Sequence, residues 1–192
     1  MRVITGIAKG RKLASFKGSD IRPTSDRARE SLFNILKGKI AGSSFLDLFA
    51  GSGAIGIEAL SRGAENMVFV ENRVTSIALV KKNLEKCGFS EGPGRHIKII
   101  HKDVLIYLKT AKKKFDIIFI DPPYKTDLAG KSLLCLSKKN MLKHDGIIVL
   151  EQYFKNVIKE EFSGLQCFKR KRIGDSVFSF FLKINEKDEA KL

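Results

Sequence analysis

The chain has 192 residues, of which 43% are hydrophobic, and this is enough for one domain to bury a substantial core. No apolar run approaches the ~20 residues of a membrane span, and the first residues lack the long apolar region of a signal peptide. The three cysteines are odd in number and far apart, and the three histidines show no metal-ligand spacing. We therefore expect a cytoplasmic protein with reduced cysteines, no metal and no membrane partner. We also expect a monomer.

Lysine and arginine total 36 against 21 aspartates and glutamates, giving a formal net charge of +15 at pH 7 and a pI near 9.8. This bias favours a polyanionic partner, with nucleic acid first, and a lysine-rich solvated surface is the alternative. From the start to Arg29, eight basic residues are opposed only by Asp20 and Asp26. Residues 1–23 are therefore interpreted as a basic arm. Its candidate contacts to nucleic-acid phosphates are Arg2, Lys9, Arg11 and Lys12.

The first predicted elements are small. Val3 to Gly6 and Arg11 to Ala14 flank Ala8-Lys9-Gly10 and predict a β-hairpin too short to be stable alone. Downstream of Arg22-Pro23, a helix is predicted with Thr24 or Ser25 as its N-cap. Its apolar face consists of Ala28, Leu32, Ile35 and Leu36. We expect this helix to pack on the core.

From Ser44 onward, short apolar runs alternate with helix-length segments, which is typical of a parallel sheet with helices on both faces. The predicted parallel strands are Ser44 to Phe49, Asn66 to Glu71, Ile97 to His101, Phe115 to Ile120 and Gly146 to Glu151. The predicted helices lie near 54–62, 73–87, 104–112 and 129–142.

The alternation changes near the C-terminus. Leu165 to Arg172 and Val177 to Ile184 flank the turn-like residues 173–176 and predict an antiparallel hairpin that closes the sheet. The sequence therefore predicts one α/β domain over 1–192, with seven strands in a mostly parallel, Rossmann-like sheet. In this division the arm is 1–23, the Rossmann-like core is 24–184 and a polar tail is 185–192.

The first predicted strand runs directly into Gly51-Ser52-Gly53-Ala54-Ile55-Gly56, a full match to the GxGxxG dinucleotide pattern. Glu71 ends the next strand about 20 residues on, where a carboxylate accepts hydrogen bonds from both hydroxyls of a ribose. These two features fit NAD as well as an adenosyl ligand. Asp47 in the first strand shifts the balance, because a carboxylate there would repel a pyrophosphate and attract an ammonium. S-adenosylmethionine is the favoured cofactor.

Asp103 follows the third strand, where it can accept a hydrogen bond from an adenine amine while the Val104 N–H meets a ring nitrogen. The alternatives are that Asp103 is only a helix N-cap and that Glu71 is a solvated strand end. Both acids share one sheet edge with Asp47 and Asp121, which favours a common ligand site. The candidate cofactor-binding residues are Asp47, Phe49, Gly51, Ser52, Gly53, Glu71, Asn72, Asp103, Val104 and Asp121.

Asp121-Pro122-Pro123-Tyr124 follows the buried strand Phe115 to Ile120, and its two prolines make the loop rigid. An exocyclic nucleobase amine is a poor nucleophile, because its lone pair is delocalised into the ring. If Asp121 Oδ and the Pro122 carbonyl accept the amine hydrogens, the nitrogen is directed at a sulfonium methyl while Tyr124 stacks on the base. Asp121, Pro122, Pro123 and Tyr124 are the candidate catalytic residues. A rigid turn with a buried tyrosine is the structural alternative.

Together, Asp47 to Gly56 and Asp121 to Tyr124 resemble the class I S-adenosylmethionine-dependent amino-methyltransferases. More closely, the chain resembles the bacterial small-subunit ribosomal RNA guanine-N2 methyltransferases over residues 1 to about 182. The segments that carry this resemblance are Arg2-Val3-Ile4, Gly10-Arg11-Lys12-Leu13, Arg22-Pro23-Thr24-Ser25-Asp26-Arg27, Arg29-Glu30-Ser31-Leu32-Phe33-Asn34 and Ser61-Arg62-Gly63-Ala64.

The resemblance implies a final strand inserted antiparallel beside its predecessor, and methylation of one guanine in ribosomal RNA at or near the small subunit. It adds Arg22, Thr24 and Arg27 to the candidate RNA-binding residues. Three alternatives stay open: a DNA adenine-N6 methyltransferase, an NAD-dependent oxidoreductase, and a non-enzymatic RNA-binding assembly factor. The preference for guanine over adenine rests on the resemblance alone.

Overall fold

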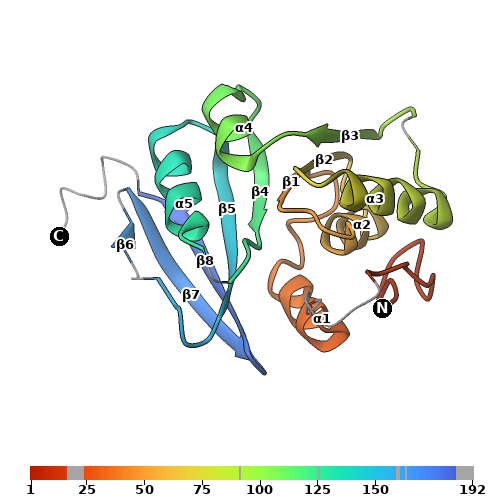
Figure 1. Ribbon diagram of the computed structural model, residues 1–192, viewed down its shortest axis with the longest axis horizontal. Helices are drawn as coiled ribbons and strands as arrows, with labels where there is room; N and C mark the ends of the chain where they lie inside the picture. The colour runs from red at the N-terminus through yellow and green to blue at the C-terminus, as the bar shows by residue number, and fades with distance from the viewer. Residues whose placement is uncertain (17–23, 91, 125, 159–160, 163, 185–192) are drawn as a thin grey trace.

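The protein folds around one mixed β-sheet, seen in a computed structural model that describes residues 1–16, 24–90, 92–124, 126–158, 161–162 and 164–184 (Figure 1). The strands are β1 Ser44–Leu48, β2 Asn66–Glu71, β3 His96–His101, β4 Phe115–Ile120, β5 Leu142–Tyr153, β6 Glu161–Phe162, β7 Leu165–Ile173 and β8 Ser176–Lys183. The helices are α1 Asp26–Ile35, α2 Ala54–Ser61, α3 Val74–Cys87, α4 Val104–Thr110 and α5 Leu128–Lys138. The sheet order is β3-β2-β1-β4-β5-β8-β7-β6.

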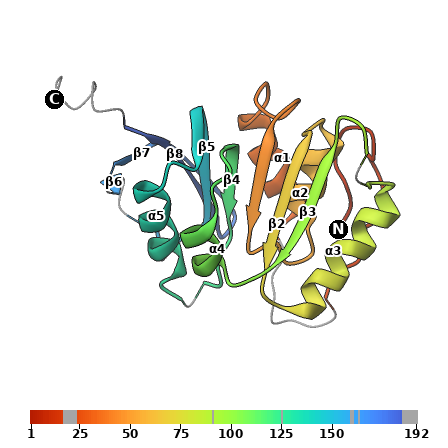
Figure 2. The same ribbon diagram turned by 90° about the horizontal axis from the view of Figure 1, so that it is seen from above.

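Strands β1 to β5 are parallel, as predicted, and their carboxyl ends therefore meet at one edge of the sheet. Helices α1, α2 and α3 supply apolar side chains to one face of the sheet, while α4 and α5 cover the other (Figure 2). The strands β1, β2 and β4 are buried almost throughout, which explains their continuous apolar runs. This arrangement is the predicted three-layer α/β architecture.

The antiparallel end of the sheet is also as expected. β8 inserts beside β5, and β7 pairs along the outer side of β8. The two-residue β6 adds an eighth strand to the seven that the sequence predicts, because Glu161 and Phe162 pair with Gln166 and Leu165.

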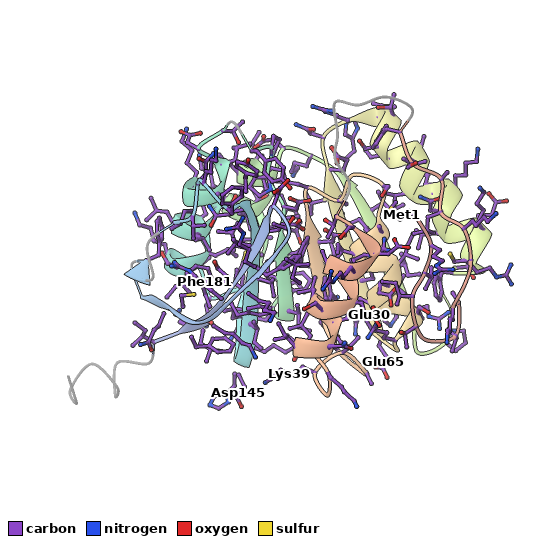
Figure 3. The ribbon with its side chains drawn as sticks, turned by 90° about the horizontal axis from the view of Figure 1, so that it is seen from below. Met1, Glu30, Lys39, Glu65, Asp145 and Phe181 are labelled. Carbon is purple, nitrogen blue, oxygen red and sulfur yellow. The ribbon has the colours of Figure 1, made fainter. Side chains whose placement is uncertain are left out.

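The predicted boundary between α5 and β5 is wrong. The expected helix 129–142 ends at Lys138, and the expected strand that begins at Gly146 begins at Leu142. The cause is a register shift in the β4–β5 pair, where Asp145 has a positive φ of 59°. Lys39 donates to the Asp145 carbonyl (3.3 Å), so this irregular stretch is tied to the loop after α1 (Figure 3).

Two glycines are required by packing or conformation. Gly56 lies in α2 where a Cβ would come within 2.3 Å of Met67 and Phe69, so the helix approaches β2 more closely than alanine permits. Gly6 has a φ of 86°, and a Cβ there would lie 1.7 Å from the Ser61 carbonyl oxygen.

Residues 1–16 of the basic arm dock on α2 and α3 instead of projecting from the core. The predicted hairpin is present in short form. It has one antiparallel bridge, between Arg2 and Lys12, and its backbone bonds run from Val3 N to the Arg11 carbonyl, from Gly10 N to the Val3 carbonyl and from Leu13 N to the Met1 carbonyl. The buried Glu58 carboxylate accepts the N–H groups of Ile4 (2.7 Å) and Thr5 (3.0 Å). Two further side chains bind this segment. Ser61 Oγ accepts the Ala8 N–H, and the Asn83 side chain accepts the Ala14 N–H and donates to the Ala14 carbonyl. The core thus holds residues 1–16 of the arm in a fixed place.

Helix α1 begins with the predicted cap, since Ser25 rather than Thr24 accepts the Ala28 N–H (3.1 Å). No helix among the described residues is long and apolar enough to cross a membrane. Within the same residues, no group of three or more His, Cys, Asp or Glu side chains is arranged to hold a metal ion.

Candidate active site

The glycine turn connects β1 to α2 through strained backbone. Phe49 has a φ of 63°, which is unusual for a residue with a side chain, and Gly51 and Gly53 have φ values of 56° and 76°. Gly53 is the N-cap of α2. The predicted strand-turn-helix context of the GxGxxG segment is therefore present, and it exposes backbone at the carboxyl edge of the sheet.

Asp47 lies beneath this turn and is only 2% exposed. Its Oδ2 accepts the Gly56 N–H (3.1 Å). Burial raises the pKa of Asp47 to about 7, and the nearby Glu71 carboxylate contributes in the same direction. A buried carboxylate with this pKa is stabilised by a cation, and the amino group of S-adenosylmethionine is a cation of suitable size. The site therefore fits this cofactor on electrostatic grounds.

Glu71 ends β2 and is 7% exposed, so it is not a solvated strand end. Its Oε2 accepts the Gly51 N–H (2.9 Å), and its Oε1 accepts the N–H groups of Asn72 (2.8 Å) and Arg73 (2.9 Å). The carboxylate thus fixes the glycine turn against the end of β2. Because Oε2 accepts only one of these bonds, it keeps a lone pair for a ribose hydroxyl.

Asp103 is an N-cap, which was the structural alternative: its Oδ1 accepts the Ile106 N–H (3.1 Å) at the start of α4. An adenine contact would have to use its other oxygen. Val74 and Ile106, which follow the neighbouring strands β2 and β3, are 67% and 53% exposed. Apolar side chains exposed at this edge offer a surface for a flat aromatic ring.

Asp121 follows β4 and is partly exposed at the same edge. Burial of its carboxyl raises its pKa well above the usual range, and the Glu151 and Asp47 carboxylates raise it further. In the described part of the chain, no residue donates a hydrogen bond to this carboxylate. The Pro123 carbonyl accepts from Thr126 N (3.2 Å) and Oγ1 (2.8 Å). Thr126 thereby fixes the loop.

A pocket of about 400 Å³ adjoins this loop. It is lined by Pro122, Pro123, Tyr124, Thr126, Asp127, Ala129, Glu151, Gln152, Tyr153 and Asn156. Tyr124 is 39% exposed, which rules out the alternative of a buried tyrosine. Its ring centroid lies 6.0 Å from that of Tyr153, and Tyr153 lies 4.7 Å from Phe154. The Arg172 Cζ atom lies 3.9 Å from the centroid of the Phe154 ring. A row of three aromatic rings and one guanidinium group therefore extends away from the pocket.

Glu151 is a further candidate active-site residue, and the sequence pattern did not predict it. It lies at the same register level as Asp121, because Ile120 of β4 pairs with Leu150 of β5. The side chain is 1% exposed, and it accepts Thr24 Oγ1 (2.8 Å) and Ser176 Oγ (2.7 Å). Its pKa is raised, chiefly by burial. The signal was available, since Glu151 ends a predicted strand just as Glu71 does.

The candidate RNA-binding residues divide into two groups. Arg2, Lys9, Arg11, Lys12 and Arg27 are exposed, and Arg2 also lies 3.8 Å from Asp26. Thr24 instead turns toward the site, where its hydroxyl binds Glu151. Arg22 lies outside the described residues, as does the tail 185–192.

A parallel sheet with a glycine turn after its first strand, acidic residues at the strand ends and an inserted antiparallel strand defines a class I methyltransferase fold. The solved structure of yhhF from Escherichia coli matches it with a TM-score of 0.83 at 29% identity, covering 96% of this chain and 98% of that chain.

The chain belongs to the family described as Conserved hypothetical protein 95, whose model matches residues 1–182. Ribosomal RNA small subunit methyltransferase D of Haemophilus influenzae is 39% identical over 155 residues, covering 79% of this chain and 78% of that protein. The Escherichia coli protein of the same name is 35% identical over 159 residues, covering 81% and 76%. The chain is thus a methyltransferase with S-adenosylmethionine as its cofactor, as the sequence predicts.

Proposed function

We propose that this protein methylates the exocyclic N2 amine of one guanine in small-subunit ribosomal RNA. The similarity to proteins named ribosomal RNA small subunit methyltransferase D supports the RNA. The pocket beside the Asp121 loop is the observation that best supports this reaction. Its wall includes Tyr124 and Tyr153, and it is large enough for a single unstacked base. The exposed basic residues of the arm supply the electrostatic attraction for RNA.

The cofactor site uses three acids of the sheet edge. Asp47 holds the ammonium, Glu71 Oε2 accepts a ribose hydroxyl, and Asp103 with the Val104 N–H binds the adenine edge. Phe49, Gly51, Ser52, Gly53 and Asn72 form the wall around them. S-adenosylmethionine supplies an electrophilic methyl group on a cationic sulfur, and this is the only chemistry that the chain itself lacks.

The catalytic loop positions the amine and stabilises its charge. Asp121 and the Pro122 carbonyl accept the two amine hydrogens, which localises the nitrogen lone pair toward the methyl group. Among the described residues, no hydrogen bond uses the Pro122 carbonyl, whereas Thr126 binds that of Pro123. With the cofactor bound, the nitrogen would form its bond to the methyl carbon as the carbon–sulfur bond breaks, and the sulfur would leave as a neutral thioether. The Asp121 carboxylate would stabilise the resulting cationic nitrogen by about 3 kcal/mol. The nitrogen then loses a proton, for which the adjacent carboxylates are acceptors.

Purified protein should be incubated with methyl-labelled S-adenosylmethionine and either unmodified small subunits, naked small-subunit RNA or duplex DNA. Mass spectrometry of the nucleosides is expected to find N2-methylguanosine from the subunit or its RNA. Asp121→Ala should lower turnover about 100-fold or more with RNA binding retained. N6-methyladenine from DNA would transfer the assignment to a DNA adenine methyltransferase. RNA binding without transfer to any substrate would favour an assembly factor.

A further inference from the structure

Asp121 and the Pro122 carbonyl recognise only an exocyclic amine, and both guanine and adenine carry one. The two bases differ at the neighbouring ring nitrogen, since N1 of guanine carries a hydrogen and N1 of adenine carries a lone pair. An enzyme that extrudes its target base reads it by hydrogen bonds to the Watson–Crick edge. A second acceptor beside Asp121 would therefore select guanine.

Glu151 is in the right place to be that acceptor. It lies on β5 directly beside Asp121, because the β4–β5 register pairs Ile120 with Leu150. Neighbouring strands are about 4.8 Å apart, so adjacent donors of one base edge reach both acids. Residues paired in a parallel sheet also point to the same face. Glu151 lines the pocket together with Tyr124 and Tyr153.

Two hydroxyl groups fix the Glu151 carboxylate in a position where it can accept a further hydrogen bond. Thr24 Oγ1 binds Oε2 and Ser176 Oγ binds Oε1, so each oxygen receives one hydroxyl and keeps a further lone pair. Burial raises the pKa of Glu151, and the two hydroxyl donors act against this rise by favouring the ionised form, so the carboxylate is ionised at alkaline pH. With two anchors from distant parts of the chain, the side chain has little freedom to turn away from N1.

We propose that Glu151 is the guanine-selecting residue, which accepts the N1–H of the target base while Asp121 and the Pro122 carbonyl hold its N2 amine. Adenine places the N1 lone pair against this carboxylate and is rejected. The inference rests on the proposed function, because it assigns base recognition within the same pocket. Thr24 and Ser176 are positioning residues for this carboxylate.

The test uses 2-aminopurine, which keeps the amine at C2 but has a lone pair at N1 and no oxygen at C6. The comparison with Glu151→Gln isolates the contribution of N1. Small-subunit RNA carrying either guanine or 2-aminopurine at the modified position is prepared by splinted ligation, and kcat/KM for both is measured at alkaline pH. The wild-type protein should prefer guanine by roughly 100-fold, the cost of losing one hydrogen bond to a charged group. In Glu151→Gln, the amide can donate to N1, so this preference should fall at least about tenfold.

Ser176→Ala is the matched control, because it removes a support but keeps the carboxylate, and it should retain the guanine preference even where turnover falls. A Glu151→Gln protein that keeps the wild-type preference would overturn the inference. So would equal wild-type kcat/KM values for the two bases, and that measurement does not depend on the variant folding. If wild-type protein fails to methylate the guanine RNA at all, it is the proposed function that fails first.

Discussion

Asp47→Asn is expected to make the protein more stable without cofactor and unable to bind cofactor tightly. In the folded chain the pKa of Asp47 is raised from 3.8 to about 7, with burial as the main cause. The unfolded chain releases this proton near pH 4, whereas the folded chain keeps it until about pH 7. Between these values the unfolded state binds fewer protons, so wild-type stability falls as the pH rises.

The magnitude follows from the two pKa values. A difference of about three pH units corresponds to about 4 kcal/mol of stability lost above pH 7, and asparagine avoids this loss because it has no charge to bury. For a chain of this length, that energy raises the melting temperature by roughly 8–16 °C. Since Asp47 is 2% exposed, solvent screening does not reduce the effect appreciably.

The assay is denaturant unfolding of cofactor-free protein across the pH range, together with calorimetric titration of S-adenosylmethionine. The stability gain of Asp47→Asn should be full above about pH 7 and absent below about pH 4, while cofactor affinity falls about 100-fold. Asp145→Asn is the control, because that side chain is 75% exposed and asparagine tolerates its positive φ. A variant that is less stable than wild type at alkaline pH would refute the electrostatic reasoning.

Three further predictions concern the packing, the arm and the stacking residue. Gly56→Ala should cost about 1–3 kcal/mol in denaturant unfolding, because its Cβ would overlap Met67 and Phe69 at 2.3 Å, and an unchanged midpoint would show that a larger residue fits there after all. Changing Lys9 and Arg11 to glutamine should reduce the salt slope of RNA binding by about one for each lost phosphate contact, and an equal slope would remove the arm from the RNA interface. Tyr124→Phe should keep most of the activity while Tyr124→Ala loses about 1–3 kcal/mol of base stacking, so full activity in the alanine variant would exclude stacking.

Local sequence patterns were sufficient to predict most of the elements. These patterns are the continuous apolar runs, the turn glycines and the helical spacing of α1. Each indicates the structure of a single segment from residues close together in the chain. They predicted the parallel strands, the glycine turn and the position of the Asp121 loop at the sheet edge. The α5–β5 boundary was predicted wrongly, because the irregular pairing of Leu142 with Phe115 is a contact between segments and leaves no local signal.

By itself, the sequence determined that this is an α/β protein with a glycine turn, a rigid Asp-Pro-Pro-Tyr loop and a strongly basic arm. Only the tertiary structure decided which polar residues meet. Thr24 reaches Glu151 across 127 positions, and Glu58 binds the N–H of Ile4 across 54. The physical reason is that periodicity encodes which residues are buried, whereas a buried polar group must find a partner, and that partner is fixed by strand register and helix packing. The pocket beside the Asp121 loop is a product of that register.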